Sequence, residues 1–341
     1  MKRIYFTLTI LFLSCIKLTA QTDVVTGLNG PAGILLDGNQ LYIAEFQTMS
    51  KIDILETSPT ITDIIVGLTG IFEMALRGND LYFSLERGRI SKIDVTETNP
   101  TITDVITGLD RPNGILLNGN DLYFCESDKI SKTDITTAIP TTTDVVTGLD
   151  RPTGMAINGN DLYIAEYGEN KIFKIDITET TPTTTDVITG LDRPYGILLN
   201  GNDLYIAEGT KISKIDITTA MPTTTDVVTG LDNPIGMAIN GNDLYIAENG
   251  ESKISKFTLG TLSTGENIIS SNIRLYPNPS PDFIQISGLP RTENYTIYNI
   301  LGTKISSGII SNNEKIDIKK SLNGLYFLKF ENGNTFKFIK K

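Results

Sequence analysis

The protein is a chain of 341 residues with a formal net charge of −11, no histidine, no tryptophan and two cysteines. Without histidine the chain has no imidazole general base, no serine–histidine or cysteine–histidine nucleophile, and no histidine ligand for zinc or haem. An acidic chain also lacks the positive surface that nucleic-acid binding requires, so no nucleic-acid partner is expected.

The first twenty residues have the layout of a secretory signal peptide. Lys2 and Arg3 give a basic start, residues 4–13 are apolar, and Ala20 is a small residue directly before Gln21. The apolar stretch is too short to span a membrane, and no other segment is long and apolar enough to do so. We therefore expect cleavage between Ala20 and Gln21, export, and no transmembrane segment in the mature protein.

Residues 21–258 are dominated by a repeat of about forty residues. The dipeptide Gly-Leu recurs at intervals of 40 to 42 residues, starting at residues 27, 67, 108, 148, 190 and 230. Each repeat contains two short apolar runs joined by a Gly-Asn turn, then a segment rich in Lys and Ile, then a Thr-rich segment. Short runs of β-branched residues between tight turns predict four strands per repeat and no helix. Four strands in forty residues are typical of a β-propeller blade.

The order of the strands predicts how the ring closes. The first outer strand, residues 22–26, precedes the first inner strand, and no outer strand follows the sixth repeat. If residues 22–26 complete the sixth blade, no blade is left with an incomplete sheet. We therefore predict an all-β fold: a six-bladed β-propeller closed by its N-terminal strand, followed by a small β-sandwich.

The repeated text also resembles known families. The pattern PxG, an apolar run, Gly-Asn, LYIAE and KID is similar to six-bladed propellers of the NHL-repeat and YWTD type, and more distantly to gluconolactonase-type propellers. The resemblance covers residues 22–258. This fold hosts binding proteins, hydrolases and lyases, so the resemblance implies a fold and not a function.

A second module is predicted at residues 273–341, after a polar linker at 259–272. Its strands alternate with Gly, Pro and Asn turns, which predicts the small β-sandwich. The segments YPNP, YNILG and NGLYFLKF and the basic last residues resemble the type A C-terminal sorting domain of the type IX secretion system. That resemblance implies inner-membrane export, outer-membrane type IX secretion, and contact with the secretion machinery and its sortase-like peptidase. The product would be secreted or attached to the outer surface.

Polar residues that recur in most repeats are interpreted as structural. A glutamate ends the second strand in five repeats and could accept backbone N–H groups of the following turn, or could form a ring that binds calcium or a cation. One tyrosine per repeat is expected to pack between blades, and the aspartates of the KID and TD motifs are expected to cap turns. Cys125 stands where other repeats have alanine and is interpreted as a small buried residue. The glutamates are Glu45, Glu126, Glu166, Glu208 and Glu248.

The candidate binding site is predicted where the repeats differ. The residue before the PxG glycine differs in all six repeats, and in repeat 2 the glycine itself is replaced by Glu73. We expect these positions at the mouth of the central channel, with Phe72 and Tyr195 as apolar platforms and Glu73 and Asn113 as polar contacts. Further polar contacts are expected from three arginines that each follow an aspartate. The alternative is drift on an exposed loop, with each Asp-Arg a self-neutralising surface pair. These arginines are Arg111, Arg151 and Arg193.

Two functions remain open from the sequence. The first is a non-catalytic binding or interaction module for an extracellular glycan, peptide or surface protein, with no cofactor and no catalytic residues. The alternative is a metal-dependent lactonase or hydrolase using calcium, which the resemblance to gluconolactonase-type propellers implies. Only Glu73 and Asn113 are candidate metal ligands for it. Near-identical blades favour the first, because an active site needs an asymmetric set of residues.

Overall fold

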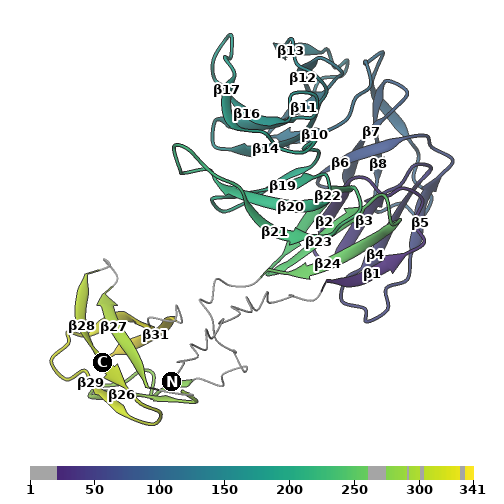
Figure 1. Cartoon of the computed structure of the whole chain (residues 1–341). Helices are drawn as coiled ribbons and strands as arrows, with labels where there is room; N and C mark the ends of the chain where they lie inside the picture. The colour runs from purple at the N-terminus through teal and green to yellow at the C-terminus, as the bar shows by residue number, and fades with distance from the viewer. Residues whose placement is uncertain (1–20, 260–273, 290–291, 300–302, 331–334) are drawn as a thin grey trace, which may run out of the picture. The chain divides into compact units, whose positions relative to one another are not determined.

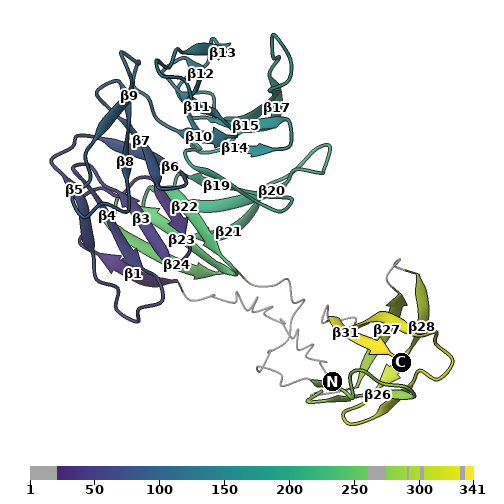
Figure 2. The ribbon, with the colours of Figure 1, turned by 180° about the vertical axis from the view of Figure 1, so that it is seen from behind.

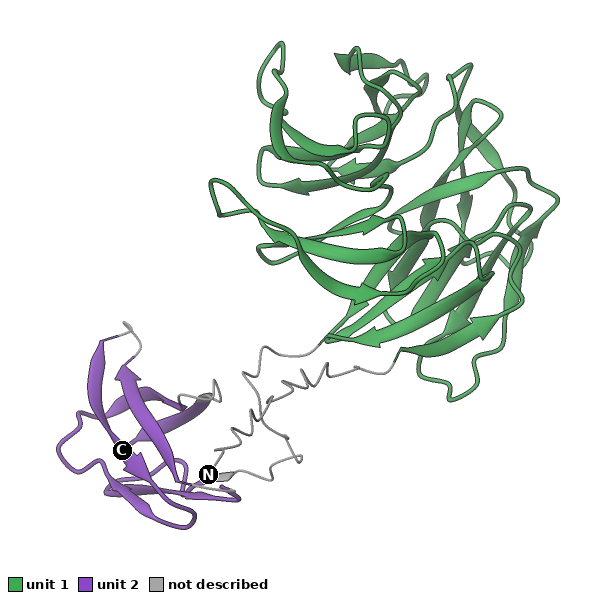
Figure 3. Cartoon of the chain, in the orientation of Figure 1, with its two compact units in different colours: residues 1–259 green, residues 260–341 purple. Residues whose placement is uncertain are grey.

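A computed structural model describes residues 21–259, 274–289, 292–299, 303–330 and 335–341. The chain divides into two compact units, Met1–Leu259 and Gly260–Lys341 (Figure 3). The expected signal peptide, up to Ala20, lies outside the described residues. Every regular element of the described ranges is a β-strand, and none is a helix long and apolar enough to cross a membrane.

The described part of the first unit forms six four-stranded antiparallel sheets, which are the blades of a propeller (Figure 1). The first strand of each blade contacts the first strands of both neighbouring blades, so these six strands surround the central channel. The first strands are β2 (Ile34–Asp37), β6 (Ile71–Arg77), β10 (Ile115–Asn118), β14 (Pro152–Asn158), β18 (Ile197–Asn200) and β22 (Pro234–Asn240).

The second and third strands of each blade form the hairpin behind the channel strand. The second strands are β3 (Gln40–Ala44), β7 (Asp80–Leu85), β11 (Asp121–Cys125), β15 (Asp161–Glu166), β19 (Asp203–Glu208) and β23 (Asp243–Glu248). The third strands are β4 (Thr48–Asp53), β8 (Arg89–Asp94), β12 (Lys129–Asp134), β16 (Lys171–Asp176), β20 (Lys211–Asp216) and β24 (Lys253–Thr258).

The outermost strands confirm the predicted closure of the ring. Blades 1 to 5 end in β5 (Thr62–Val66), β9 (Thr103–Thr107), β13 (Thr143–Thr147), β17 (Thr185–Thr189) and β21 (Thr225–Thr229). The sixth blade has the strand order β1-β24-β23-β22, so its outer strand is the N-terminal β1 (Thr22–Thr26) (Figure 2). Thr22 pairs with Lys256 and Thr26 with Lys253.

The apolar core lies between the blades and not within them. Each of six buried clusters in residues 21–259 draws side chains from two neighbouring blades, because successive residues of a strand face opposite sides of its sheet. The recurrent tyrosine of each blade belongs to one of these clusters, which confirms its expected packing role. Tyr42, for example, packs with Phe83 of the next blade.

The blades alternate between two forms. In blades 2, 4 and 6 the first strand has seven residues, and in blades 1, 3 and 5 it has four. The longer strands start with an extra pair, such as Pro152 with Glu166, followed by a register shift. The alternation gives the ring a three-fold pseudosymmetry with two blades per unit. This agrees with the sequence, in which repeats 3 and 4 together are nearly identical to repeats 5 and 6.

The second unit contains two antiparallel sheets that share an apolar core. One sheet has the order β25-β26-β29 and the other β28-β27-β30-β31, and buried residues of both, such as Ile284 and Leu328, form one cluster. The strands are β25 (Arg274–Tyr276), β26 (Phe283–Ser287), β27 (Glu293–Asn299), β28 (Lys304–Ile310), β29 (Lys315–Asp317), β30 (Gly324–Phe330) and β31 (Thr335–Lys340).

Candidate ligand site at the channel mouth

One face of the propeller gathers the loops in which the repeats differ. In each blade the start of the first strand, the end of the second and the start of the third lie at the same end of the sheet. In blade 4, for example, Glu166 pairs with both Pro152 and Lys171. The connection between blades and the turn between second and third strands therefore meet on this face, which we call the mouth.

The mouth contains a cavity of about 430 Å³ that blades 2 to 6 line. Five of the seven predicted site residues line it: Phe72, Arg111, Asn113, Arg151 and Tyr195. The two others are elsewhere. Glu73 lies deeper in the channel, and Arg193 lines neither the mouth cavity nor the channel cavity below it.

The residue before the glycine of each repeat forms a ring at the mouth, which we call the mouth ring. Asn113 Nδ2 donates to the hydroxyl oxygen of Tyr195 at 2.8 Å, which links blade 3 to blade 5 over blade 4. Burial raises the pKa of the Tyr195 hydroxyl to about 12, although the Asn113 bond opposes the shift. The members are Ala32, Phe72, Asn113, Thr153, Tyr195 and Ile235.

A second variable ring was missed in the sequence. It comes one residue after the recurrent glutamate, or after Leu85 in blade 2, and we call it the turn ring. Glu86, Ser127 and Tyr167 of this ring line the mouth cavity. The rings of Tyr167 and Tyr195 meet edge to face with centroids 6.3 Å apart. All six repeats differ here too, which is the signal that could have identified the ring: Phe46, Glu86, Ser127, Tyr167, Gly209 and Asn249.

The arginines occupy a backbone position that favours glycine. Arg111, Arg151 and Arg193 each have φ of 52°, and the same place in blades 1 and 2 is held by Gly30 and Gly70 with φ of 60° and 63°. A residue with a side chain is strained in this left-handed region. The sequence therefore places bulky cations where the fold itself would prefer glycine.

The three arginines have different partners. Arg151 and Arg193 pair with their preceding aspartates at 3.2 and 3.1 Å, as the self-neutralising interpretation expects. The guanidinium of Arg151 also lies over the ring of Tyr167, 4.8 Å from its centroid. Arg111 makes no ion pair or hydrogen bond through its side chain within the described residues.

The residue that follows each member of the mouth ring is glycine in five of the six blades, and at this level the backbones of neighbouring blades come close together. A Cβ on Gly114 would stand 1.9 Å from the carbonyl oxygen of Thr153, and one on Gly154 would stand 2.5 Å from that of Tyr195. These contacts require glycine, because neighbouring blades approach backbone to backbone. Blade 2 alone has a side chain at this level, that of Glu73.

Of the described residues that line a channel cavity of about 300 Å³, Glu73 is the one that is ionisable. Its other lining residues are apolar side chains and glycines, among them Ile34, Met155 and Met237. Burial raises the pKa of Glu73 to about 7, and the N–H of Met74, which donates to Glu73 Oε1 at 3.0 Å, only partly opposes the shift. Glu73 therefore keeps its proton to higher pH than an exposed glutamate does.

Cys125 has a structural role, as the sequence interpretation expected. It is fully buried, and its Sγ donates to the carbonyl oxygen of Thr153 in the next blade at 3.0 Å. Ser84, at the equivalent position in blade 2, donates to the carbonyl oxygen of Asn113. Burial raises the pKa of the Cys125 thiol, which disfavours the nucleophilic thiolate.

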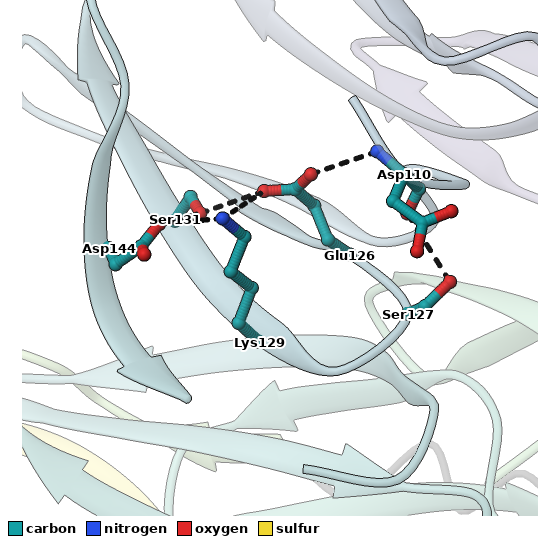
Figure 4. A network of polar contacts seen from close by, with 6 residues as sticks. All are labelled: Asp110, Glu126, Ser127, Lys129, Ser131 and Asp144. Atoms are coloured by element: carbon teal, nitrogen blue, oxygen red, sulfur yellow. Dashed lines mark hydrogen bonds and ion pairs between the residues drawn. The ribbon is translucent and has the colours of Figure 1, made fainter. Parts of the chain in front are cut away.

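The recurrent glutamates are structural, but their partner differs from the one expected. Glu126 is buried and accepts the N–H of Asp110, in the connection that precedes the blade, at 2.9 Å (Figure 4). Its other oxygen accepts the hydroxyl of Ser131 at 2.9 Å. Equivalent bonds hold the connections of the other four blades that have this glutamate. The carboxylates therefore fasten the mouth loops.

The two aspartate motifs have different roles. The KID aspartates cap turns as expected; Asp94, for example, accepts the N–H of Thr96 at 2.9 Å. The expectation for the TD aspartates was wrong. Asp144 pairs with Lys129 at 2.8 Å across the third and fourth strands, because the strand register brings these residues together.

The donor groups do not fit the metal centre that the lactonase alternative requires. Glu73 and Asn113 line different cavities, and Asn113 already donates to Tyr195. No group of three or more acidic or cysteine side chains in the part of the chain that the structure describes is arranged to hold a metal ion. We therefore derive no metal-dependent step from these residues.

Comparison with known proteins identifies the second unit. Residues 274–341 match the family model of the secretion system C-terminal sorting domain. This domain directs export by the type IX system to the cell surface or beyond it, and implies contact with the secretion machinery. No curated protein matches the sequence.

Solved structures similar to the first unit have low sequence identity. Virginiamycin B lyase from Staphylococcus aureus is 17% identical, with a TM-score of 0.52 over 71% of this chain and 99% of that one. An auxiliary nutrient binding protein from Bacteroides thetaiotaomicron is 17% identical, with a TM-score of 0.56 over 67% of this chain and 69% of that one. A luciferin-regenerating enzyme is 14% identical, with a TM-score of 0.58 over 71% of this chain and 96% of that one. These likenesses show the fold alone, and the chain is thus a six-bladed β-propeller followed by a type IX secretion sorting domain.

Proposed function

We propose that the protein is an exported, non-catalytic binding module whose ligand occupies the mouth cavity of the propeller. The observation that supports this proposal is that the positions at which the six repeats differ line one cavity. The mouth ring and the turn ring each have six different residues in six repeats, and both contribute to the lining. The surrounding strands and the residues that fasten the loops are nearly constant.

Repeats 3 and 5 make the same point within one recent duplication. Their sequences are almost identical, yet they differ at both mouth positions: Asn113 against Tyr195, and Ser127 against Gly209. Asn113 and Tyr195 are then joined by a hydrogen bond across the mouth. The two different residues thus form a specific contact with each other. This favours a binding site over the alternative, random sequence drift on an exposed loop.

The polar groups favour binding over catalysis. Glu73 is the one carboxyl group in the channel cavity, and no second ionisable residue lines that cavity to complete an acid–base pair. The thiol of Cys125 is buried and occupied as a donor to Thr153. The mouth instead offers aromatic faces, an amide and guanidinium groups, which are typical of ligand recognition.

Binding can be tested with the purified protein against a panel of neutral glycans, uronic acids, amino acids, short peptides and lactones. Each compound is added with calcium or with a chelator, and thermal melting and ligand-observed NMR report binding. We expect at least one class to bind without turnover, and Tyr195→Ala and Asn113→Ala to abolish the signal. Met221→Ala, which truncates a side chain 86% exposed on the β20–β21 connection, is the control. Turnover of a lactone, or binding that depends on calcium, would overturn the proposal.

We further propose that export begins with removal of residues 1–20 and ends with processing of the sorting domain by a sortase-like peptidase. The signal layout of the first twenty residues and the match of residues 274–341 support this order. Sequencing of the secreted protein should give Gln21 as its first residue. An N-terminus elsewhere would refute the cleavage site, and retention of the intact sorting domain on all secreted protein would refute the processing step.

A further inference from the structure

We propose that the mouth cavity binds a small zwitterion: an α-amino acid with a large apolar side chain, free or within a short peptide. In this arrangement Arg111 receives the carboxylate, Glu86 receives the ammonium group, and the aromatic residues of the mouth receive the side chain. The inference rests on the proposed function and names the ligand class for the same cavity.

Among the residues that the structure describes, Arg111 is the cavity-lining cation that has no ion pair. Of three identical Asp-Arg-Pro segments, the other two hold their arginine against the preceding aspartate, whereas Arg111 has no such ion pair and lines the cavity. Its backbone has φ of 52°, at a position where blades 1 and 2 use glycine. An unpaired guanidinium at a cavity, on a backbone position that costs strain to keep, is suited to a planar anion such as a carboxylate.

Glu86 is the free anion of the same cavity. In five blades the glutamate at the end of the second strand is buried and fastens a loop, but in blade 2 Leu85 takes that place and the glutamate falls one residue later. Glu86 is exposed, lines the cavity, and makes no side-chain hydrogen bond or ion pair within the described residues. It is therefore available to a ligand.

These two charges lie on neighbouring loops and do not neutralise each other. The N–H of Leu109 donates to the carbonyl oxygen of Gly88 at 2.9 Å, which holds the connection that carries Arg111 against the turn that carries Glu86. Nevertheless, in the part of the chain that the structure describes, the two side chains form no ion pair. Opposite charges that face one cavity without pairing suit a ligand that brings one charge of each sign.

The remaining lining provides a surface for an apolar side chain. Phe72, Tyr167 and Tyr195 all line the cavity, and the edge-to-face contact of the two tyrosines orients their rings. Arg151 lies over Tyr167 and so fixes that ring further. Aromatic faces of this kind bind flat or branched apolar groups through surface burial.

The charge of the whole propeller distinguishes a zwitterion from simpler ions. Residues 21–259 contain 34 acidic and 16 basic residues, a formal charge of −18. This field opposes a plain carboxylate, while the arginines at the mouth oppose a plain ammonium ion. A zwitterion can pair with both Arg111 and Glu86, and because its net charge is zero the negative field of the propeller does not repel it.

The experiment compares three probes that share one ring: L-phenylalanine, phenylacetate and phenethylamine. Dissociation constants are measured by ligand-observed NMR on the full chain at pH 7 and low ionic strength. We expect L-phenylalanine to bind about tenfold more tightly than either single ion, since each lost charge-assisted bond weakens binding by about that factor. Equal binding of phenylacetate, equal binding of phenethylamine, or no binding by any probe would overturn the inference.

Two variants assign the charges. Arg111→Gln should remove the preference for L-phenylalanine over phenethylamine, and Glu86→Gln the preference over phenylacetate. Arg77→Gln is the control, because Arg77 is an exposed arginine at the end of β6 away from the mouth and does not line the cavity; it should leave all three constants unchanged. An unchanged preference in either test variant refutes the assignment. If another class from the panel binds at the mouth while all three probes fail, the ligand class is wrong and the proposed binding function stands.

Discussion

Replacing the channel carboxyl group by its neutral isostere should make the propeller more stable at high pH and not at low pH. In the folded protein the pKa of Glu73 is about 7, above its ordinary value of 4.5. The folded state therefore holds a proton that the unfolded state releases between these two values, so Glu73 lowers stability progressively as pH rises from about 4.5 to 7. Above pH 7 the full penalty applies. The shift corresponds to about 3 kcal/mol, as an order of magnitude.

Glu73→Gln removes this penalty, so at pH 8 it should raise the free energy of unfolding by up to about 3 kcal/mol and the melting temperature by about 5–10 °C. At pH 4.5 the variant and the parent should differ little. Urea unfolding followed by circular dichroism at both pH values measures the effect, with Glu169→Gln as a control that removes an exposed carboxylate. A difference that is the same at both pH values, or a less stable variant at pH 8, would refute the argument from burial.

Three further substitutions test the frame around the mouth. Glu126→Ala leaves the N–H of Asp110 without its acceptor, and should lower the free energy of unfolding by about 2 kcal/mol; a urea titration that shows no loss contradicts the loop-fastening role. Cys125→Ala removes one thiol donor and should change stability by less than about 1 kcal/mol, and the parent thiol should react with a thiol reagent only after unfolding. Rapid reaction in the native protein would show that Cys125 is accessible. Arg111→Gly removes the strain of the left-handed backbone and should raise the free energy of unfolding by about 1 kcal/mol, while it weakens binding of L-phenylalanine. A urea titration that shows no increase in the free energy of unfolding would show that the strain is absent.

The fold was predictable because its determinants are local and repeated. Gly-Asn turns, strand-length apolar runs and the order of the strands specify four strands per repeat and closure by residues 22–26, all of which the structure confirms. The alternation of long and short first strands was not predictable in this way. It depends on one extra cross-strand pair, such as that of Pro152 with Glu166, which only the register reveals.

The arrangement of the candidate site residues was predictable only in part. Phe72, Asn113 and Tyr195, which variation among the repeats singles out, line one cavity. Neighbours in sequence nevertheless lie at different levels: Phe72 lines the mouth cavity and Glu73 the channel cavity below it. One position along the strand decides how deep in the channel a side chain lies, and this depth cannot be read from the sequence. The sequence shows that the glutamate of repeat 2 stands one residue later than in the other repeats, but not that this offset brings Glu86 to the mouth cavity.

The pairing of β1 with β24 also sets the order in which the molecule can be completed. Thr22 is synthesised before the first five blades, but its partner Lys256 is made only after them. Contacts between such distant segments form slowly, because a long loop must close before they stabilise anything. Until that moment β24 presents an unpaired edge at which another chain could add a strand. For an exported protein, slow pairing of β1 with β24 would therefore leave the last blade open to aggregation or proteolysis. The short N-terminal strand ends this exposure once it has paired.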